Sequence, residues 1–212
     1  MEATPLIITH TIAHDEAEGM MRDIEFLARN VYNSSTVISA DVLFGWYQRN
    51  PSLWWLAKIN NRLIGYIYVI PLKKDTFQKT LRLGFDEKLD IIDDAIRNWN
   101  DGQSNQYSLY LCSSVVDPLY QKSFVLPIHL LLVQNLLKTL VFYGKSGTIM
   151  TEWSAFAVSR VGCHIAQEYY DMTCLARDNH NNSIFYGITN CEHQEVLLQN
   201  IQRKLELRKL KI

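Results

Sequence analysis

One stretch in the middle of the sequence could bind an anion. The apolar run Tyr107–Val116 predicts a strand, Asp117-Pro118 ends it, and the apolar run Pro127–Tyr143 predicts a helix. Such a strand–helix junction leaves backbone N–H groups unpaired at the helix start, and these groups bind anions such as a pyrophosphate together with the helix dipole. The polar residues Gln121 to Ser123 lie at this junction, and the Lys122 ammonium could pair with a phosphate. The alternative is that they only cap a buried helix.

Two kinds of proton-transferring side chain follow the junction. Glu152 is the single acidic residue in the predicted strand Thr148–Ser154, and a charge within an apolar strand requires a partner or a role. It is either a base or an outward-facing residue at a strand end. Tyr169 and Tyr170 lie near the end of the predicted helix Ser159–Tyr170, where they could serve as an acid or pack in the core.

The composition excludes several classes of protein. The chain has 212 residues and is 48% hydrophobic, which fits one globular domain over residues 1–212. The 21 Lys and Arg nearly balance the 22 Asp and Glu, so no basic excess exists to meet a nucleic acid. Apolar runs are too short for a transmembrane segment. The four cysteines form no CxxC pair, so we expect reduced thiols, a cytoplasmic protein and no metal site.

The first half of the chain predicts a strand, two helices and a hairpin. The strand covers residues 6–13, and the helices run from Asp15 to Val31 and from Ala40 to Gln48. The runs 53–59 and 63–70 are rich in aromatic and β-branched residues, and the Asn60-Asn61-Arg62 turn between them tolerates positive φ. Both runs are apolar on both faces, so we expect the hairpin to lie in a sheet covered by helices.

The second half predicts alternating strands and helices after a polar excursion over residues 73–106. The buried helix from Pro127 is expected to end at Gly144. Further strands are expected at 148–154, 172–176 and 183–189. Residues 191–212 predict a basic amphipathic helix, which either docks on the domain or binds a membrane surface or a partner. This order predicts an α/β domain with a mixed sheet and helices on both faces.

Three stretches of the sequence resemble the GNAT superfamily of acyl-CoA-dependent N-acyltransferases. The stretch "WWLAKINNRLIGYIYVIPL", Trp54 to Leu72, resembles the second and third strands of that family. The stretch Leu109 to Leu132 resembles the fourth strand, the V-x-P-x-Y-[RQ] junction, here Val116 to Gln121, and the cofactor-binding helix. The stretch "SRVGCHIAQEYYDM", Ser159 to Met172, is similar to the helix before the sixth strand.

The resemblance implies a fold and an activity. The fold is a mixed, mostly antiparallel sheet that splays at its centre between Tyr107–Val116 and Thr148–Ser154, with helices on both faces. The activity is transfer of an acetyl group from acetyl-CoA, the co-substrate, to an amine by direct attack in a ternary complex. The acceptor would be an amine-bearing small molecule or peptide.

The resemblance also implies site residues. The pantetheine arm would pair with backbone near Ser114, Val115 and Val116. Residues that would bind the cofactor at the phosphate end are Gln121, Lys122, Ser123, Phe124, Val125 and Leu126. Glu152 would act as the base, often through water, and Tyr169 is the nearest candidate for the acid.

The sequence departs from the family's phosphate-binding turn. Phe124 and Leu126 stand where that turn has glycines, and Pro127 has no N–H to donate. Side chains at these positions could block the close backbone approach that glycine permits. A catalytically silent GNAT-like binding or regulatory module is therefore the alternative to an enzyme.

Overall fold

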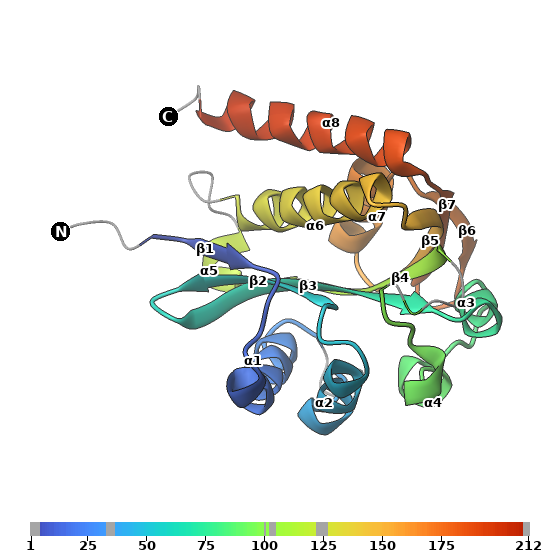
Figure 1. Cartoon of the computed structure of the whole chain (residues 1–212), viewed down its shortest axis with the longest axis horizontal. Helices are drawn as coiled ribbons and strands as arrows, with labels where there is room; N and C mark the ends of the chain where they lie inside the picture. Colours follow the sequence, from blue (N-terminus) through green and yellow to red (C-terminus); the bar gives the residue numbers. More distant parts are fainter. Residues whose placement is uncertain (1–4, 33–36, 100, 102–104, 122–126, 210–212) are drawn as a thin grey trace.

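Seven strands form one mixed sheet in the order β1-β2-β3-β4-β5-β7-β6 (Figure 1). The computed structural model describes residues 5–32, 37–99, 101, 105–121 and 127–209. The strands are β1 (Ile7–Thr9), β2 (Trp54–Ile59), β3 (Arg62–Leu72), β4 (Gln106–Val116), β5 (Ile149–Ala157), β6 (Thr173–Arg177) and β7 (Ser183–Ile188). β4 and β5 pair in parallel, whereas the other neighbours are antiparallel. The predicted sheet and the parallel pair at its centre are confirmed.

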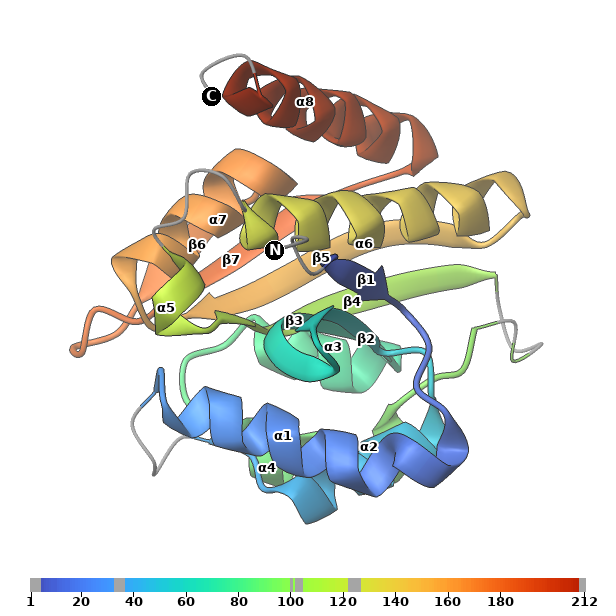
Figure 2. The same ribbon diagram turned by 90° about the vertical axis from the view of Figure 1, so that its left-hand side faces the viewer.

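Helices cover both faces of the sheet (Figures 1 and 2). The helices are α1 (Ala17–Arg29), α2 (Ala40–Arg49), α3 (Lys74–Thr80), α4 (Glu87–Asp90), α5 (Pro118–Gln121), α6 (Ile128–Lys145), α7 (Arg160–Tyr170) and α8 (Cys191–Lys209). α1 and α2 lie on one face, and α6, α7 and α8 lie on the other. The adjacent residues Trp54 and Trp55 are both fully buried, one in each of the two cores. Their burial explains why the hairpin is apolar on both faces.

The β2–β3 hairpin turns at Asn60 and Asn61, which have φ values of 51° and 61°. Positive φ at both central residues gives a turn whose twist matches the twist of the flanking strands. The predicted hairpin is confirmed.

A β-bulge at Cys112 marks the point where the sheet opens. Tyr68 pairs with Ser113 and Val69 with Leu111, so Cys112 is an extra residue in β4. On the other side of β4, the parallel pairing with β5 ends at Leu111 and Ala155. Beyond this point β4 continues along β3 only and β5 continues along β7 only. Since a bulge bends its strand and increases the local twist, the two central strands diverge here.

Two predicted elements extend past their expected ends. α6 continues through Gly144 to Lys145, because Gly144 lies against α8: a Cβ there would lie 2.8 Å from the Cys191 sulfur. β5 extends three residues beyond the predicted end, to Ala157. The excursion over residues 73–106 contains the short helices α3 and α4. The close approach of α8 therefore accounts for Gly144, which does not end α6.

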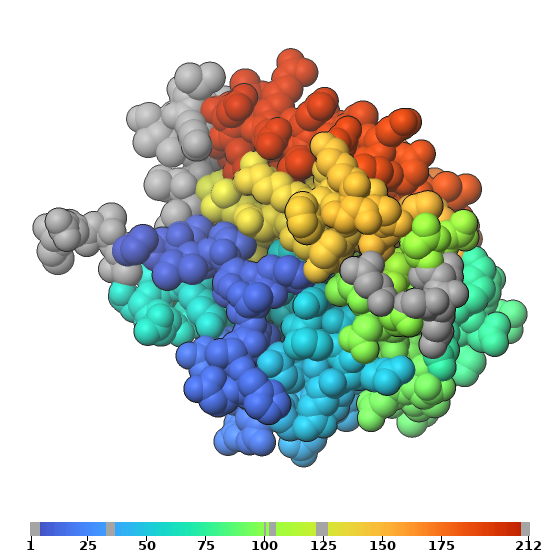
Figure 3. Space-filling view, in the orientation of Figure 1, coloured from blue at the N-terminus to red at the C-terminus, as the bar shows by residue number. Residues whose placement is uncertain are grey.

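α8 docks along α6, which agrees with the first of the two alternatives for the C-terminal helix, docking on the domain. Leu197, Ile201 and Leu205 are buried on the α6 side. In the space-filling view the red α8 atoms lie directly on the yellow α6 atoms (Figure 3). Within the described ranges, no helix is both long enough and apolar enough to cross a membrane.

Gly65 allows α6 to approach the sheet beside the opening. A Cβ at this position would lie 3.1 Å from both the Ile128 side chain and the Val115 carbonyl oxygen. We predict that Gly65→Val lowers the free energy of unfolding by about 1–3 kcal/mol, because overpacking displaces the start of α6. Denaturant unfolding measures this change. Gly19→Val is the control: Gly19 has no atom within 4 Å of an added Cβ, so no loss is expected there.

Candidate functional site

A cavity of about 580 Å³ lies in the opening between β4 and β5. Its walls come from the β4 segment beyond the parallel pairing, the last residues of β5, the first turn of α6 and one side of α7. The β4 backbone has no strand partner on the β5 side from Cys112 to Val116, in the pairing that the structure describes. This edge offers peptide groups to an extended ligand with amide bonds of its own.

The structure brings all four predicted cofactor residues that it describes to this first cavity. Ser114, Val115, Val116 and Gln121 all line it. The Gln121 amide donates a hydrogen bond to the Val116 carbonyl oxygen at 2.8 Å, which ties α5 to the end of β4. The predicted residues Lys122, Ser123, Phe124, Val125 and Leu126 lie outside the described residues.

His129 brings an unsatisfied polar atom to the wall of the first cavity. Its Nδ1 atom lies 3.2 Å from the Ser114 hydroxyl, and its Nε2 atom is buried without a hydrogen-bond partner among the described residues. Burial lowers the pKa of His129 to about 4, so the ring is neutral at pH 7. No spacing in the sequence indicated that His129 would line a cavity, because it lies in an apolar helix like a core residue.

Both predicted tyrosines also line this cavity. The Tyr169 ring lies 5.9 Å from the rings of His129 and His164, centroid to centroid. Burial raises the pKa of Tyr169, and it raises the pKa of Tyr170 further. The buried Tyr170 hydroxyl has no hydrogen-bond partner among the described residues. His129 and Tyr170, each with a polar atom buried without a described partner, line this mostly apolar cleft, which fits a ligand with both apolar and hydrogen-bonding groups.

A second cavity, of about 600 Å³, meets the first at the bulge. Both cavities are lined by Cys112, Ser113 and Phe156. The walls of the second cavity come from α1, β3 and the segment that leads into α4, and they are rich in aromatic and aliphatic side chains. A ligand in the first cavity and another in the second would therefore meet where β4 and β5 diverge.

Glu87 is an acidic group of the second cavity that the sequence analysis missed. Its carboxylate accepts a hydrogen bond from the Tyr110 hydroxyl, and the Cys112 thiol lies within hydrogen-bonding reach. Burial raises the pKa of Glu87, and the hydrogen bonds from Tyr110 and Cys112 oppose this rise only in part. No sequence signal marked Glu87, since it is one of several acids in a polar segment.

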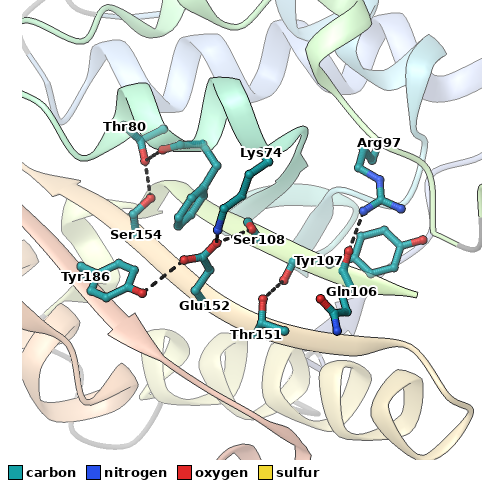
Figure 4. Close-up of polar contacts among 11 residues, drawn as sticks. Lys74, Thr80, Arg97, Gln106, Tyr107, Ser108, Thr151, Glu152, Ser154 and Tyr186 are labelled. Atoms are coloured by element: carbon teal, nitrogen blue, oxygen red, sulfur yellow. Dashed lines mark hydrogen bonds and ion pairs between the residues drawn. The ribbon is translucent and has the colours of Figure 1, made fainter. Parts of the chain in front are cut away.

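Glu152, the predicted base, has a different environment. Its carboxylate accepts hydrogen bonds from Lys74 of α3, from the Ser108 hydroxyl at 2.6 Å and from the Tyr186 hydroxyl at 3.2 Å (Figure 4). Burial favours the neutral carboxyl group, but these partners more than offset it and lower the pKa of Glu152. Neither cavity has Glu152 among its described lining residues. The structure thus separates Glu152 from Tyr169 and gives it three partners that tie α3, β4 and β7 together.

No protein-family model matches the sequence, and no curated protein matches it. Solved structures do match. The loading GNATL domain of CurA from Lyngbya majuscula has a TM-score of 0.63 at 9% identity, over 89% of this chain and 99% of that one. The GphF GNAT-like decarboxylase in complex with isobutyryl-CoA has a TM-score of 0.57 at 12% identity, over 86% and 98%. The NatC complex bound to Gag peptide and CoA has a TM-score of 0.55 at 13% identity, over 87% and 98%.

These similarities show that the chain has the GNAT fold, as the resemblance of its sequence implies. Two of the three structures contain CoA or an acyl-CoA.

The contacts of Glu152 predict a pH-dependent contribution to stability. We expect Glu152→Gln to lower the free energy of unfolding by about 1–3 kcal/mol at pH 7, because it loses charged hydrogen bonds. A carboxylate whose pKa is lowered by folding stabilises the protein above its unfolded pKa of about 4.3. The difference in the free energy of unfolding between wild type and Glu152→Gln should therefore shrink as the pH falls below about 4. Urea unfolding between pH 3 and pH 7 measures it.

The matched control is Glu18→Gln, which removes an exposed ion pair with Arg22. Exposed pairs contribute about 0–1 kcal/mol, so little change is expected at any pH. An equal, pH-independent loss in both variants would contradict the role assigned to Glu152.

Proposed function

We propose that this protein transfers an acyl group, an acetyl group by its resemblance, from an acyl-CoA to an amine. The observation that carries the proposal is the meeting of two cavities at Cys112 and Ser113, where β4 and β5 diverge. Such an arrangement holds a thioester donor and an amine acceptor side by side, which converts a bimolecular reaction into a positioned one.

The acyl-CoA is proposed to lie in the first cavity. Its pantetheine amides would pair with the open β4 edge at Ser114, Val115 and Val116, and the side chains of His129 and Tyr170 would lie along the arm. The phosphates would lie at the start of α6, near Gln121 and residues 122–126. The acyl-CoA itself supplies the activated thioester.

The amine is proposed to enter from the second cavity, with Glu87 as the base. The amine nitrogen attacks the thioester carbonyl carbon, the C–N bond forms and the C–S bond breaks. Glu87 accepts the proton lost by the nitrogen, and a proton is delivered to the leaving thiolate; Tyr169 is the candidate donor. We assign the base to Glu87 because it faces the cavity junction, whereas Glu152 is held by three partners.

Direct attack is proposed rather than an acyl-enzyme. Burial and the neighbouring Glu87 raise the pKa of the Cys112 thiol, so the cysteine at the junction is protonated at pH 7. A protonated thiol is a poor nucleophile.

A binding or regulatory module without catalysis is the second candidate. It is favoured by Phe124, Leu126 and Pro127, which replace glycines and an N–H donor at the phosphate end.

Binding of the acyl donor, acetyl-CoA, can be measured directly. We expect acetyl-CoA to bind with measurable heat in calorimetric titration and to raise the melting temperature, since a ligand at 100 times its Kd stabilises the folded state by about 2.7 kcal/mol. ADP, which lacks the pantetheine arm, is the control ligand and should give a much smaller shift. No heat and no thermal shift at millimolar acetyl-CoA would contradict the acyltransferase and leave the silent module.

Substitution of Glu87 tests its proposed role as the base. We expect Glu87→Gln to lower kcat about 10²- to 10⁴-fold, because a general base contributes that much, with acetyl-CoA affinity unchanged. The wild-type rate should fall as the pH drops through the raised pKa of Glu87. A carboxyl group whose pKa is raised by folding costs stability as it ionises, so the variant should be no less stable than wild type at pH 7.

The matched comparison is Glu152→Gln, assayed at a temperature where both variants are folded. Loss of transfer in Glu152→Gln with full activity in Glu87→Gln would reverse the assignment of the base.

A further inference from the structure

α8 runs antiparallel to α6 and brings its C-terminal end to the first cavity. Its start is fixed at the end of α6, where Cys191 contacts Gly144 and Lys145 pairs with Glu195 at 2.6 Å. The 18 residues from Cys191 to Arg208 span about 25 Å of helix, and α6 has nearly the same length back to its first turn. Arg208 accordingly lines the first cavity together with residues of that first turn.

The C-terminal end of α8 carries positive charge beside this cavity. The Lys204 ammonium lies 4.8 Å from the centroid of the Tyr169 ring and 3.7 Å from the Glu168 carboxylate. Arg208 lies close enough to Tyr169 for its charge to oppose the rise in the Tyr169 pKa. Lys204 is paired with Glu168, and Arg208 is a cationic side chain of α8 that lines the cavity.

The start of α6 adds a second positive contribution at the same end of the cavity. Pro127, Ile128 and His129 all line the cavity, and the first turn of α6 contains no acidic residue to offset the helix dipole. His129 adds a buried Nε2 atom without a described partner. An anion placed here meets both the helix terminus and a guanidinium.

The sequence between Pro118 and Gly144 contains no glycine, so every backbone position from there to Tyr143 carries a side chain or a proline ring. Side chains keep a backbone farther from a phosphate than glycine does. A long cationic side chain from another element can supply the missing interaction, and a guanidinium binds phosphate oxygens in a bidentate manner.

We propose that Arg208 of α8 binds a phosphate group of the acyl-CoA at the mouth of the first cavity. This inference rests on the proposed function, because it assumes that the cavity takes an acyl-CoA. It gives the basic C-terminal helix a role in donor recognition, and it predicts selection for donors that carry phosphates over acyl-pantetheines that carry none.

The test is calorimetric titration of CoA and of pantetheine into wild type, Arg208→Ala and Arg208→Lys. We expect Arg208→Ala to weaken CoA binding about 10- to 100-fold, as loss of a charged hydrogen bond does, and to leave pantetheine binding unchanged. Arg208→Lys should recover part of the loss. The matched control is Arg203→Ala, an exposed arginine of the same helix, which should bind both ligands as wild type does.

Salt dependence gives a second readout that a structural role would not move. CoA affinity of wild type should fall more steeply with rising salt than CoA affinity of Arg208→Ala, because a screened ion pair is lost in the variant. Titration with 3′-dephospho-CoA then locates the phosphate: a reduced effect of Arg208→Ala on this ligand assigns the 3′-phosphate, and an equal effect assigns the diphosphate.

Equal CoA affinities in wild type and Arg208→Ala would overturn this inference and leave the proposed function intact. A parallel loss of CoA and pantetheine binding, with unchanged salt dependence, would overturn it in favour of a packing role. Absence of CoA binding to the wild type would instead overturn the proposed function itself.

Discussion

The candidate site depends on one interruption of backbone pairing at the centre of the sheet. β4 and β5 are parallel and paired up to Leu111 and Ala155, and the bulge at Cys112 turns β4 away from β5 beyond that point. A continuous sheet would satisfy these peptide groups internally and leave no opening. Because the strands diverge, a cavity forms on each side and the two meet at the bulge.

The helices that surround this opening pack closely on the sheet and on one another. The start of α6 packs on Gly65 of β3, and α8 packs along α6 from Gly144 to the first cavity. Ser159 caps α7 by accepting a hydrogen bond from the Gly162 N–H at 3.0 Å, which fixes the helix that supplies Tyr169 and Tyr170. Rigid elements thus surround a region where the sheet itself is incomplete.

Glu152 and Glu87 are two carboxylates whose environments shift their pKa values in opposite directions. Glu152 has three hydrogen-bonding partners, including the Lys74 ammonium, and its pKa is lowered. Glu87 has a phenol and a thiol as neighbours, and its pKa is raised. The lowered pKa keeps the Glu152 carboxylate charged beside its cationic partner, whereas the raised pKa of Glu87 favours the proton transfer proposed for it.

The sequence by itself determined the elements and their order, because these depend on local patterns. Asn60-Asn61 defines the hairpin through positive φ, and the apolar runs define the central strands and α6. Which carboxylate faces the opening was decided only by tertiary structure, because strand register and helix docking set side-chain directions. Glu87 and Cys112 lie 25 residues apart, and Arg208 of α8 lines the same cavity as His129 of α6, so no spacing in the sequence could bring them together.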